Sequence, residues 1–129
     1  MPFRFEPASP GKPWCTLHLS GLITPDDLRV MIRAQIEHGA WAQDALIDTT
    51  GAVGMRQGYN DLAEQVLFIE RESEGLPQRG AVAILAPADD IFGVARMYQV
   101  AQDTALGFRL EVFRTREDAE AFLRSSRAR

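Results

Sequence analysis

The sequence predicts an α/β domain with one mixed five-stranded sheet, an N-terminal β-hairpin and four helices, in the order β-β-α-β-α-β-α-β-α. Two strand-like segments, "FRFEP" and "PWCTLHLSG", flank the turn-forming "ASPGKP". Segments with helical spacing then alternate with short apolar strands, as in a largely parallel sheet. One strand, "RGAVAILAP", is an almost unbroken apolar run. With 129 residues, the chain fits a single domain spanning residues 1–129.

The hairpin predicts a sheet with only one fully buried face, because polarity alternates along its second strand. Cys15 and His18 point to opposite faces of that strand, so they do not form a nucleophile with its base. We expect Cys15 to be a buried structural residue. One face carries Cys15, Leu17 and Leu19, and the other carries Trp14, Thr16 and His18.

The first helix has sequence signals at both ends. Thr24 suits the N-cap, Pro25 the first helical position, and Gly39 the end of the helix. Helical spacing places Leu28, Ile32 and Ile36 on the core side, and Arg29, Arg33 and Glu37 on a polar face.

The rest of the chain alternates strand and helix. "DALIDTTG" predicts a short strand followed by a polar turn, and "RGAVAILAP" predicts a central strand. A helix over residues 59–74 lies between them, with Leu62, Val66 and Ile69 as its core stripe. A third helix over 89–102, the strand "FRLEVF" and a helix capped by Thr115 complete the chain. The order of the strands in the sheet stays open.

Two segments resemble a known family. "IFGVARMYQ" and "LEVFRTREDAEAFL" are similar to packing motifs of bacterial STAS-like proteins of the SpoIIAA-like group, which is related to SEC14-type lipid-binding domains. The resemblance covers nearly the whole chain and implies a STAS-like fold. It also implies a small cytoplasmic domain. The better-understood relatives are regulators that bind partner proteins, so the resemblance implies a regulatory role as well.

The resemblance also shows a departure from the family. In STAS anti-sigma-factor antagonists a serine at a helix start is phosphorylated to switch partner binding. Here "LIDTTGAVGMRQGY" keeps Asp48 and Gly51, but the serine pair falls on Gln57 and Gly58. Thr49, Thr50 and Tyr59 are the hydroxyl groups close by. We therefore expect binding without the usual phosphoserine switch.

Composition argues against several classes of function. A net charge of -4 and a pI of about 5.1 disfavour nucleic-acid binding, which requires clustered Lys and Arg. No apolar run approaches the roughly 20 residues of a membrane span, and "MPFRFEPASP" lacks the core of a signal peptide. We expect a cytoplasmic protein without an integral membrane segment. One Cys and two His argue against a metal site, and no cofactor motif is present.

The polar candidates follow the strand "DALIDTTG". Asp48, Thr49 and Thr50 form the rim of a binding crevice, since open α/β sheets bind ligands at the carboxyl ends of strands. Alternatively, they satisfy backbone groups in a turn. Asp89 and Asp90 are simply explained as caps of the third helix. No nucleophile with its base is visible, so we expect no enzymatic activity.

The third helix raises two further questions. Gly93 interrupts a helix, and its missing side chain is explained if a neighbouring backbone approaches closely. Arg96 lies opposite the sheet-facing stripe of Ile91, Val94, Tyr98 and Ala101. It stacks on Phe92, pairs with Asp103, or recognises a carboxylate or phosphate.

Aromatic residues suggest an interaction surface. Phe68 projects away from the core stripe of its helix, between Glu64 and Glu72, and Phe92 points outward from the next helix. The first hypothesis is a non-enzymatic binding or regulatory domain acting through a protein partner or a homodimer. The alternative is a carrier or sensor of a small apolar or lipid-like ligand, with its anionic head near Arg96.

Overall fold

The computed structural model describes residues 3–56, 58 and 60–127. It confirms the predicted element order and the α/β class. The strands are β1 (Phe3–Glu6), β2 (Cys15–Ile23), β3 (Ala45–Met55), β4 (Val82–Leu85) and β5 (Leu110–Phe113). The helices are α1 (Pro25–Glu37), α2 (Asp61–Glu72), α3 (Asp89–Leu106) and α4 (Arg116–Arg127).

The five strands form one mixed sheet in the order β1-β2-β3-β4-β5. β1 pairs with β2 in antiparallel fashion, as predicted for the hairpin, and the other three pairings are parallel. The apolar segment expected to be central is β4, an inner strand between β3 and β5. The middle position belongs to β3.

β3 is longer than predicted. The polar residues from Thr49 to Gly51 belong to a strand that continues to Met55, where the sequence predicts a turn. The reason lies in β2, which also continues to Ile23 and pairs with β3 up to Ile23 and Met55, with two register irregularities on the way. Because each long strand supplies the backbone partners of the other, the polar sequence does not end β3.

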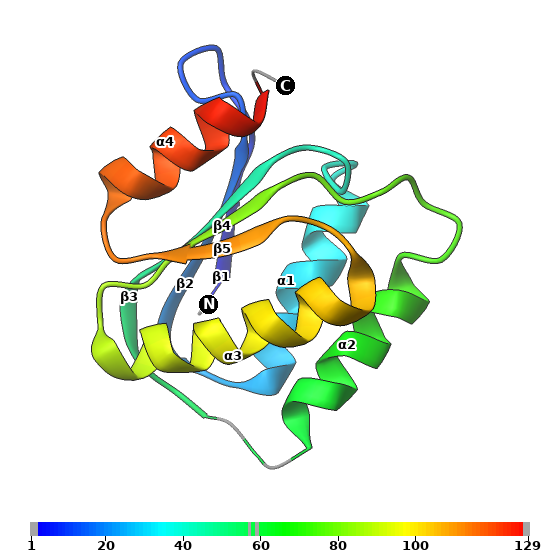
Figure 1. The fold of residues 1–129 in the computed structure, drawn as a ribbon, viewed down its shortest axis with the longest axis vertical. Coiled ribbons are helices and arrows are strands. Elements are labelled where there is room, and N and C mark those ends of the chain that lie inside the picture. Colours follow the sequence, from blue (N-terminus) through cyan, green and yellow to red (C-terminus); the bar gives the residue numbers. More distant parts are fainter. Residues whose placement is uncertain (1–2, 57, 59, 128–129) are drawn as a thin grey trace.

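Helices cover both faces of the sheet unequally. α1, α2 and α3 lie on one side and α4 alone on the other (Figure 1). The larger core lies under α1–α3 and includes Leu17, Ile32 and Ile91. The smaller core lies under α4 and consists of Trp14, Leu46, Ala83, Leu85, Ala119 and Leu123, with Phe113 and Phe122 packed against it. Within the described part of the chain, no helix is long and apolar enough to cross a membrane.

The predicted ends of α1 are confirmed. The Thr24 hydroxyl accepts a hydrogen bond from the backbone N–H of Asp27 at 3.3 Å, and the Asp27 carboxylate accepts one from the Thr24 N–H at 2.9 Å. This reciprocal pair satisfies two N–H groups that the helix leaves free. Beyond the C-cap residue His38, Gly39 adopts a positive φ of 68°, which suits glycine.

The prediction that Phe68 is exposed is wrong. Phe68 is 7% exposed and belongs to the larger core, between α2 and α1. The guanidinium groups of Arg29 and Arg33 on α1 lie 6.0 and 5.1 Å from its ring centroid. They also pair with Glu64 at 3.6 Å and Glu72 at 3.1 Å. The predicted polar faces of α1 and α2 therefore face each other and cover the ring.

The explanation offered for Gly93 is also wrong. A Cβ at Gly93 would meet nothing within 4 Å, because the residue is exposed on the outer side of α3. The close backbone approach occurs instead at Gly80, where a Cβ would lie 2.3 Å from the carbonyl oxygen of Gln43. The buried stripe of α3 consists of Ile91, Ala95, Tyr98 and Gln102, so it contains two of the four predicted residues.

Candidate functional site

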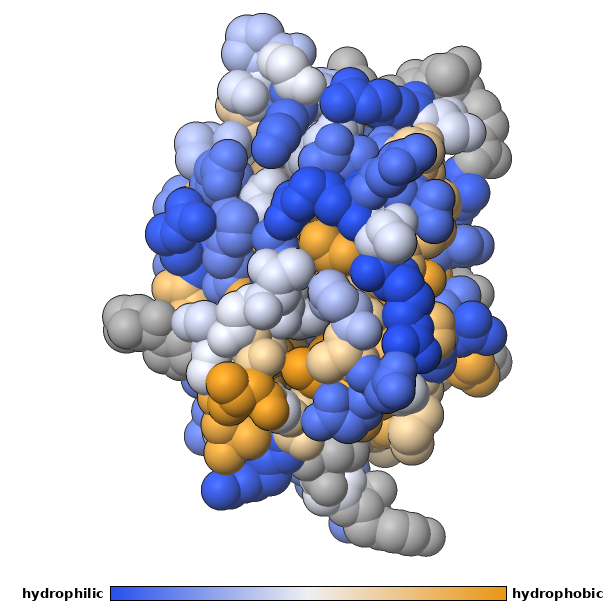
Figure 2. Space-filling model, turned by 90° about the vertical axis from the view of Figure 1, so that its left-hand side faces the viewer, coloured by the Kyte–Doolittle hydropathy of each residue, from blue (hydrophilic) through white to orange (hydrophobic). Residues whose placement is uncertain are grey.

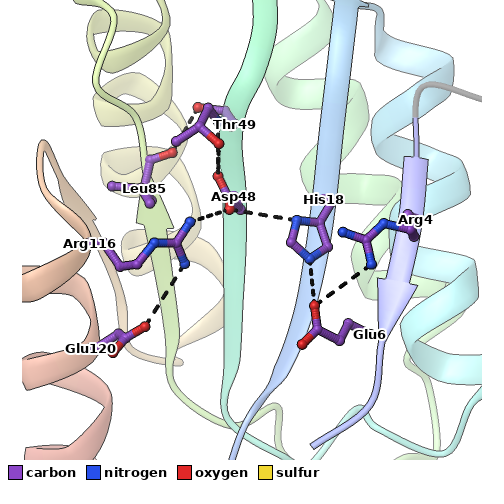
Figure 3. A network of polar contacts seen from close by, with 9 residues as sticks. Arg4, Glu6, His18, Asp48, Thr49, Leu85, Arg116 and Glu120 are labelled. Carbon is purple, nitrogen blue, oxygen red and sulfur yellow. Dashed lines mark hydrogen bonds and ion pairs between the residues drawn. The ribbon is translucent and has the colours of Figure 1, made fainter. Parts of the chain in front are cut away.

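Asp48 is the centre of a polar network on the α4 side of the sheet (Figure 3). Its side chain is almost fully buried, although it carries a charge. One carboxylate oxygen accepts hydrogen bonds from the backbone N–H and the hydroxyl of Thr50, at 2.9 and 2.7 Å. The other accepts one from Arg116 at the start of α4, at 2.6 Å. Asp48 thus ties the middle strand to the helix above it.

The network continues across the sheet to β1 (Figure 3). The Nδ1 atom of His18 on β2 lies 3.6 Å from Asp48 Oδ2, and its Nε2 atom lies 2.9 Å from Glu6 Oε1 on β1. Arg116 also approaches Glu120 one turn later, at 3.9 Å. A surface hollow of about 310 Å³ opens beside Arg4, His18, Ser20 and Thr50.

The network holds its carboxylates in the ionised form. Burial alone raises the pKa of Asp48, but the Thr50 N–H, the Arg116 guanidinium and the Thr50 hydroxyl together lower it below the ordinary value. The hydrogen bond with His18 lowers the pKa of Glu6. Asp48 is therefore unsuited to act as a general acid near neutral pH.

The same contacts restrict base catalysis. Both ring nitrogens of His18 face carboxylates, and both oxygens of Asp48 already accept hydrogen bonds. A general base needs a free lone pair within reach of its substrate, so His18 and Asp48 are poorly placed to act as one.

Among the described residues, no group of three or more His, Cys, Asp or Glu side chains could hold a metal ion.

The predicted rim of Asp48, Thr49 and Thr50 does not form one site. Because residues alternate along β3, Asp48 and Thr50 face α4 while Thr49 faces α1–α3. Thr49 is buried, and its hydroxyl donates to the carbonyl oxygen of Leu85 at 2.8 Å. Thr50 is exposed, but its hydroxyl points at the Asp48 carboxylate. A phosphate on Thr50 would face that negative charge. Gln57 and Tyr59 lie outside the described residues.

An internal cavity of about 50 Å³ lies on the other side of the sheet, beneath α1, α2 and α3. Its walls are largely apolar, with Leu28, Ile47 and Ile91 from three different elements. Five polar residues also line it, namely Thr49, Gln65, Arg79, Tyr98 and Gln102. The side-chain oxygen of Gln102 is buried and has no hydrogen-bond partner among the described residues.

Arg79, which precedes β4 in the chain, also lines this cavity and is 6% exposed. Its guanidinium carbon lies 4.5 Å from the ring centroid of Trp41 and 4.9 Å from that of Phe108. Nη2 donates to the side-chain oxygen of Gln35 at 2.8 Å, while Nε is buried and has no partner among the described residues. Burial lowers the pKa of Arg79 to about 9, so the group remains charged at neutral pH.

Arg96 and Phe92 are not placed as the sequence predicts. Phe92 is half-buried, and Arg114, not Arg96, covers its ring at 4.2 Å from the centroid. Arg96 is exposed and does not line the cavity, so it is not positioned to hold the head of a ligand there. The alternative pairing with Asp103 involves a side chain outside the described ones.

The outer side of α3 exposes apolar side chains. Met97 is 54% exposed and Val100 63%, and both lie on the same helical face as Gly93, beside the exposed Arg96. These four residues are named the α3 outer surface. Elsewhere, hydrophilic groups dominate the side of the molecule seen in Figure 2, and hydrophobic groups gather in its lower half. The paired ends of β2 and β3 also expose two apolar side chains, Leu22 and Val53.

Sequence reasoning missed the two arginines that matter most for buried charge. Arg116 is the first residue of α4, where the helix dipole disfavours a cation, so its position signals an anionic partner. Arg79 directly precedes the most apolar strand, which signals burial of a charged group. His18 was assigned to the correct face, but its two carboxylate neighbours come from other strands.

Three solved structures are similar to this chain, and the first of them shares its fold. An uncharacterized protein from Shewanella loihica PV-4, of the DUF3478 family and with a SpoIIAA-like fold, has a TM-score of 0.57 at 19% identity, over 94% of this chain and 91% of that one. The anti-sigma factor antagonist SpoIIAA in its unphosphorylated form gives 0.48 at 17%, over 95% and 97%. The Bacillus cell fate determinant SpoIIAA in its phosphorylated form gives 0.45 at 18%, over 98% and 99%.

No sequence model of a known family matches the chain. No curated protein matches it either. The predicted STAS-like, SpoIIAA-like fold is confirmed by the structural likeness alone.

Proposed function

We propose that this protein is a non-enzymatic binding domain that regulates a protein partner, or a second copy of itself, through the α3 outer surface. The observation that carries the proposal is the pair of large apolar side chains, Met97 and Val100, exposed side by side on one helix face. Gly93 leaves room there for a partner to approach. Arg96 adds a cation at the edge, suited to a carboxylate on the partner.

The other features agree with binding and not with catalysis. His18 and Asp48 are the nearest approach to an acid–base pair, and both are occupied by contacts within the fold. The resemblance to STAS-like regulators supports the same function. The acidic net charge supports a partner other than nucleic acid, and we expect the protein to act in the cytoplasm.

Affinity capture from the protein's own cells tests this function. The wild type is compared with a Met97→Glu/Val100→Glu double variant, and with Val53→Glu as the control. Val53 is 80% exposed and lies on β3, so it is an exposed apolar residue that does not belong to the α3 outer surface. We expect a defined protein, or the chain itself, to be captured by the wild type and the control but not by the double variant. Capture that is equal for all three proteins would contradict the proposal.

A second function is carriage or sensing of a small apolar ligand with an anionic head group. The cavity beneath α1–α3 favours it, because apolar walls surround a few polar groups as in many ligand sites. The cavity is much smaller than a lipid tail, so a lipid-like ligand would require the helices to move. Titration with short-chain and long-chain fatty acids, followed by thermal unfolding, measures whether any ligand of this class binds.

A further inference from the structure

Arg79 is a buried charge without a counter-charge. No carboxylate pairs with it among the residues that the structure describes, and its one hydrogen bond goes to the neutral Gln35. The two flanking rings provide part of the missing solvation. Removing a guanidinium from water is nevertheless costly unless an anion compensates. Nε, for which the described residues offer no partner, is a donor available to such an anion.

Arg79 also occupies a particular place. Of the described residues, it is the one that lines the internal cavity and two surface hollows. One hollow, of about 330 Å³, is lined by both polar and apolar residues, among them Trp41, Gln78 and Phe108. The other, of about 300 Å³, contains Arg109 and the carboxylate of Asp44. A group bound in either hollow therefore lies beside the same arginine that lines the cavity.

We propose that Arg79 binds the carboxylate of a small organic acid whose short apolar chain occupies the cavity beneath α1–α3. This inference rests on the second of the two functions above and replaces Arg96 by Arg79 as the anion-binding residue. The guanidinium supplies charge-assisted hydrogen bonds, and the apolar wall excludes water from the chain.

The volume determines which acids fit. About 50 Å³ is roughly one third of the ~150 Å³ apolar cavity that holds benzene in a well-studied protein. A chain of a few carbon atoms therefore suits the space better than a long acyl chain. The carboxylate itself remains at Arg79, on the boundary between the cavity and the surface.

Butyrate is the first probe, and butyramide is its uncharged counterpart of nearly the same shape. Isothermal titration calorimetry on the full chain measures the Kd of each, and dodecanoate tests whether the acid belongs to a longer lipid. We expect butyrate to bind saturably and butyramide at least about tenfold more weakly, because a hydrogen bond to a charged group is lost. Dodecanoate is expected to bind more weakly than butyrate.

Arginine variants assign the site. Arg79→Met should weaken butyrate binding at least about tenfold, whereas Arg96→Met, which changes an arginine that does not line the cavity, should bind as the wild type does. If Arg79→Met does not fold, the Nε–Hε NMR signal of Arg79 in the wild type replaces it, and this signal should shift on titration with butyrate. Butyrate affinity that is unchanged in Arg79→Met, or an unmoved Nε–Hε signal at saturation, would overturn the assignment and leave the carrier function intact.

The remaining outcomes are equally decisive. Tighter binding of dodecanoate than of butyrate would support a carrier but contradict the short acid inferred here. Equal binding of butyramide would show that charge is not recognised. Absence of binding by any fatty acid would overturn both this inference and the carrier function, while the protein-binding function would stand.

Discussion

The two sides of the sheet are stabilised in different ways. Beneath α1–α3 lies an extensive apolar core, in which Phe68 is sealed by arginines from α1. Beneath α4 lies a much smaller core, and the sheet beside it is covered by the charged network from Glu6 to Arg116. α4 packs on β3, β4 and β5 and leaves β1 and β2 without a helix on that side. Polar contacts thus occupy the part of this sheet face that α4 does not cover.

This difference separates structure from binding. The network on the α4 side is closed, because its buried carboxylate and the His18 ring already have partners. The side covered by α1–α3 has what a binding protein requires, namely a cavity, a buried cation at Arg79 and exposed apolar groups on α3. The variants below change one side at a time.

Phe68→Glu should have the largest effect. It removes a buried ring and places a charge between α1 and α2, so the free energy of unfolding should fall by at least about 4 kcal/mol. Urea denaturation measures the change. Leu67→Glu is the matched control, because Leu67 is exposed on the same helix, and it should cost less than about 0.5 kcal/mol. The reverse order of the two variants would show that the orientation of α2 is wrong.

Asp48→Asn should cost less, about 2 kcal/mol, because it removes the charge from a buried, hydrogen-bonded group whose partner Arg116 is partly solvated. The same urea experiment measures it. Asp89→Asn serves as the control, since Asp89 pairs with Arg114 at the surface and should contribute little. Equal stability of the two variants would contradict the claim that the network around Asp48 stabilises the packing of α4 on the sheet.

The pH dependence sharpens this prediction. The pKa of Asp48 is lowered in the folded protein, so its contribution is fully present above its unfolded pKa of about 3.9 and is lost as the pH falls through the folded value. The stability difference between wild type and Asp48→Asn should therefore be constant from about pH 5 to 7 and shrink below about pH 4. Glu6 titrates in both proteins, so its contribution to the stability difference largely cancels. A difference that persists unchanged at pH 3 would contradict the role of the charge.

Gly93→Ala should have the smallest effect, and of opposite sign. The added methyl group meets nothing within 4 Å, and alanine favours the helix by about 1 kcal/mol. Thermal unfolding should show a modest increase in Tm. A decrease would mean that a close neighbour is present after all. If Gly93 admits a partner, the same variant should weaken capture of that partner while it stabilises the fold.

Sequence periodicity was sufficient for the order of helices and strands along the chain, because each element carries its own local pattern. It failed where the outcome depended on which elements become neighbours. Phe68 was assigned to solvent because its own helix offers no reason to bury it, whereas the reason, Arg33, lies on α1. The predicted strand ended too early, because the pairing of β3 with the C-terminal end of β2 cannot be inferred from the polar residues of β3 itself.

The candidate site was predictable only in part for the same reason. Asp48 was singled out by its position, but Arg116 lies 68 residues away in the chain. Arg96 was chosen because it stands alone in an apolar helix, yet the arginine at the cavity is Arg79, which the structure places there by packing it between Trp41 and Phe108. Charge patterns in a sequence show that an arginine is unusual, and only the fold shows what it meets.

The division between the two sides is tested most directly by native mass spectrometry of the protein purified gently from its own cells. The wild type is measured beside two variants, Met97→Glu on the side covered by α1–α3 and Arg116→Gln on the α4 side. We expect a non-covalent complex, with a partner or a second copy, for the wild type and Arg116→Gln, and the free chain for Met97→Glu. A complex that survives Met97→Glu but is lost in Arg116→Gln would place binding on the α4 side and contradict the proposed role of the α3 outer surface.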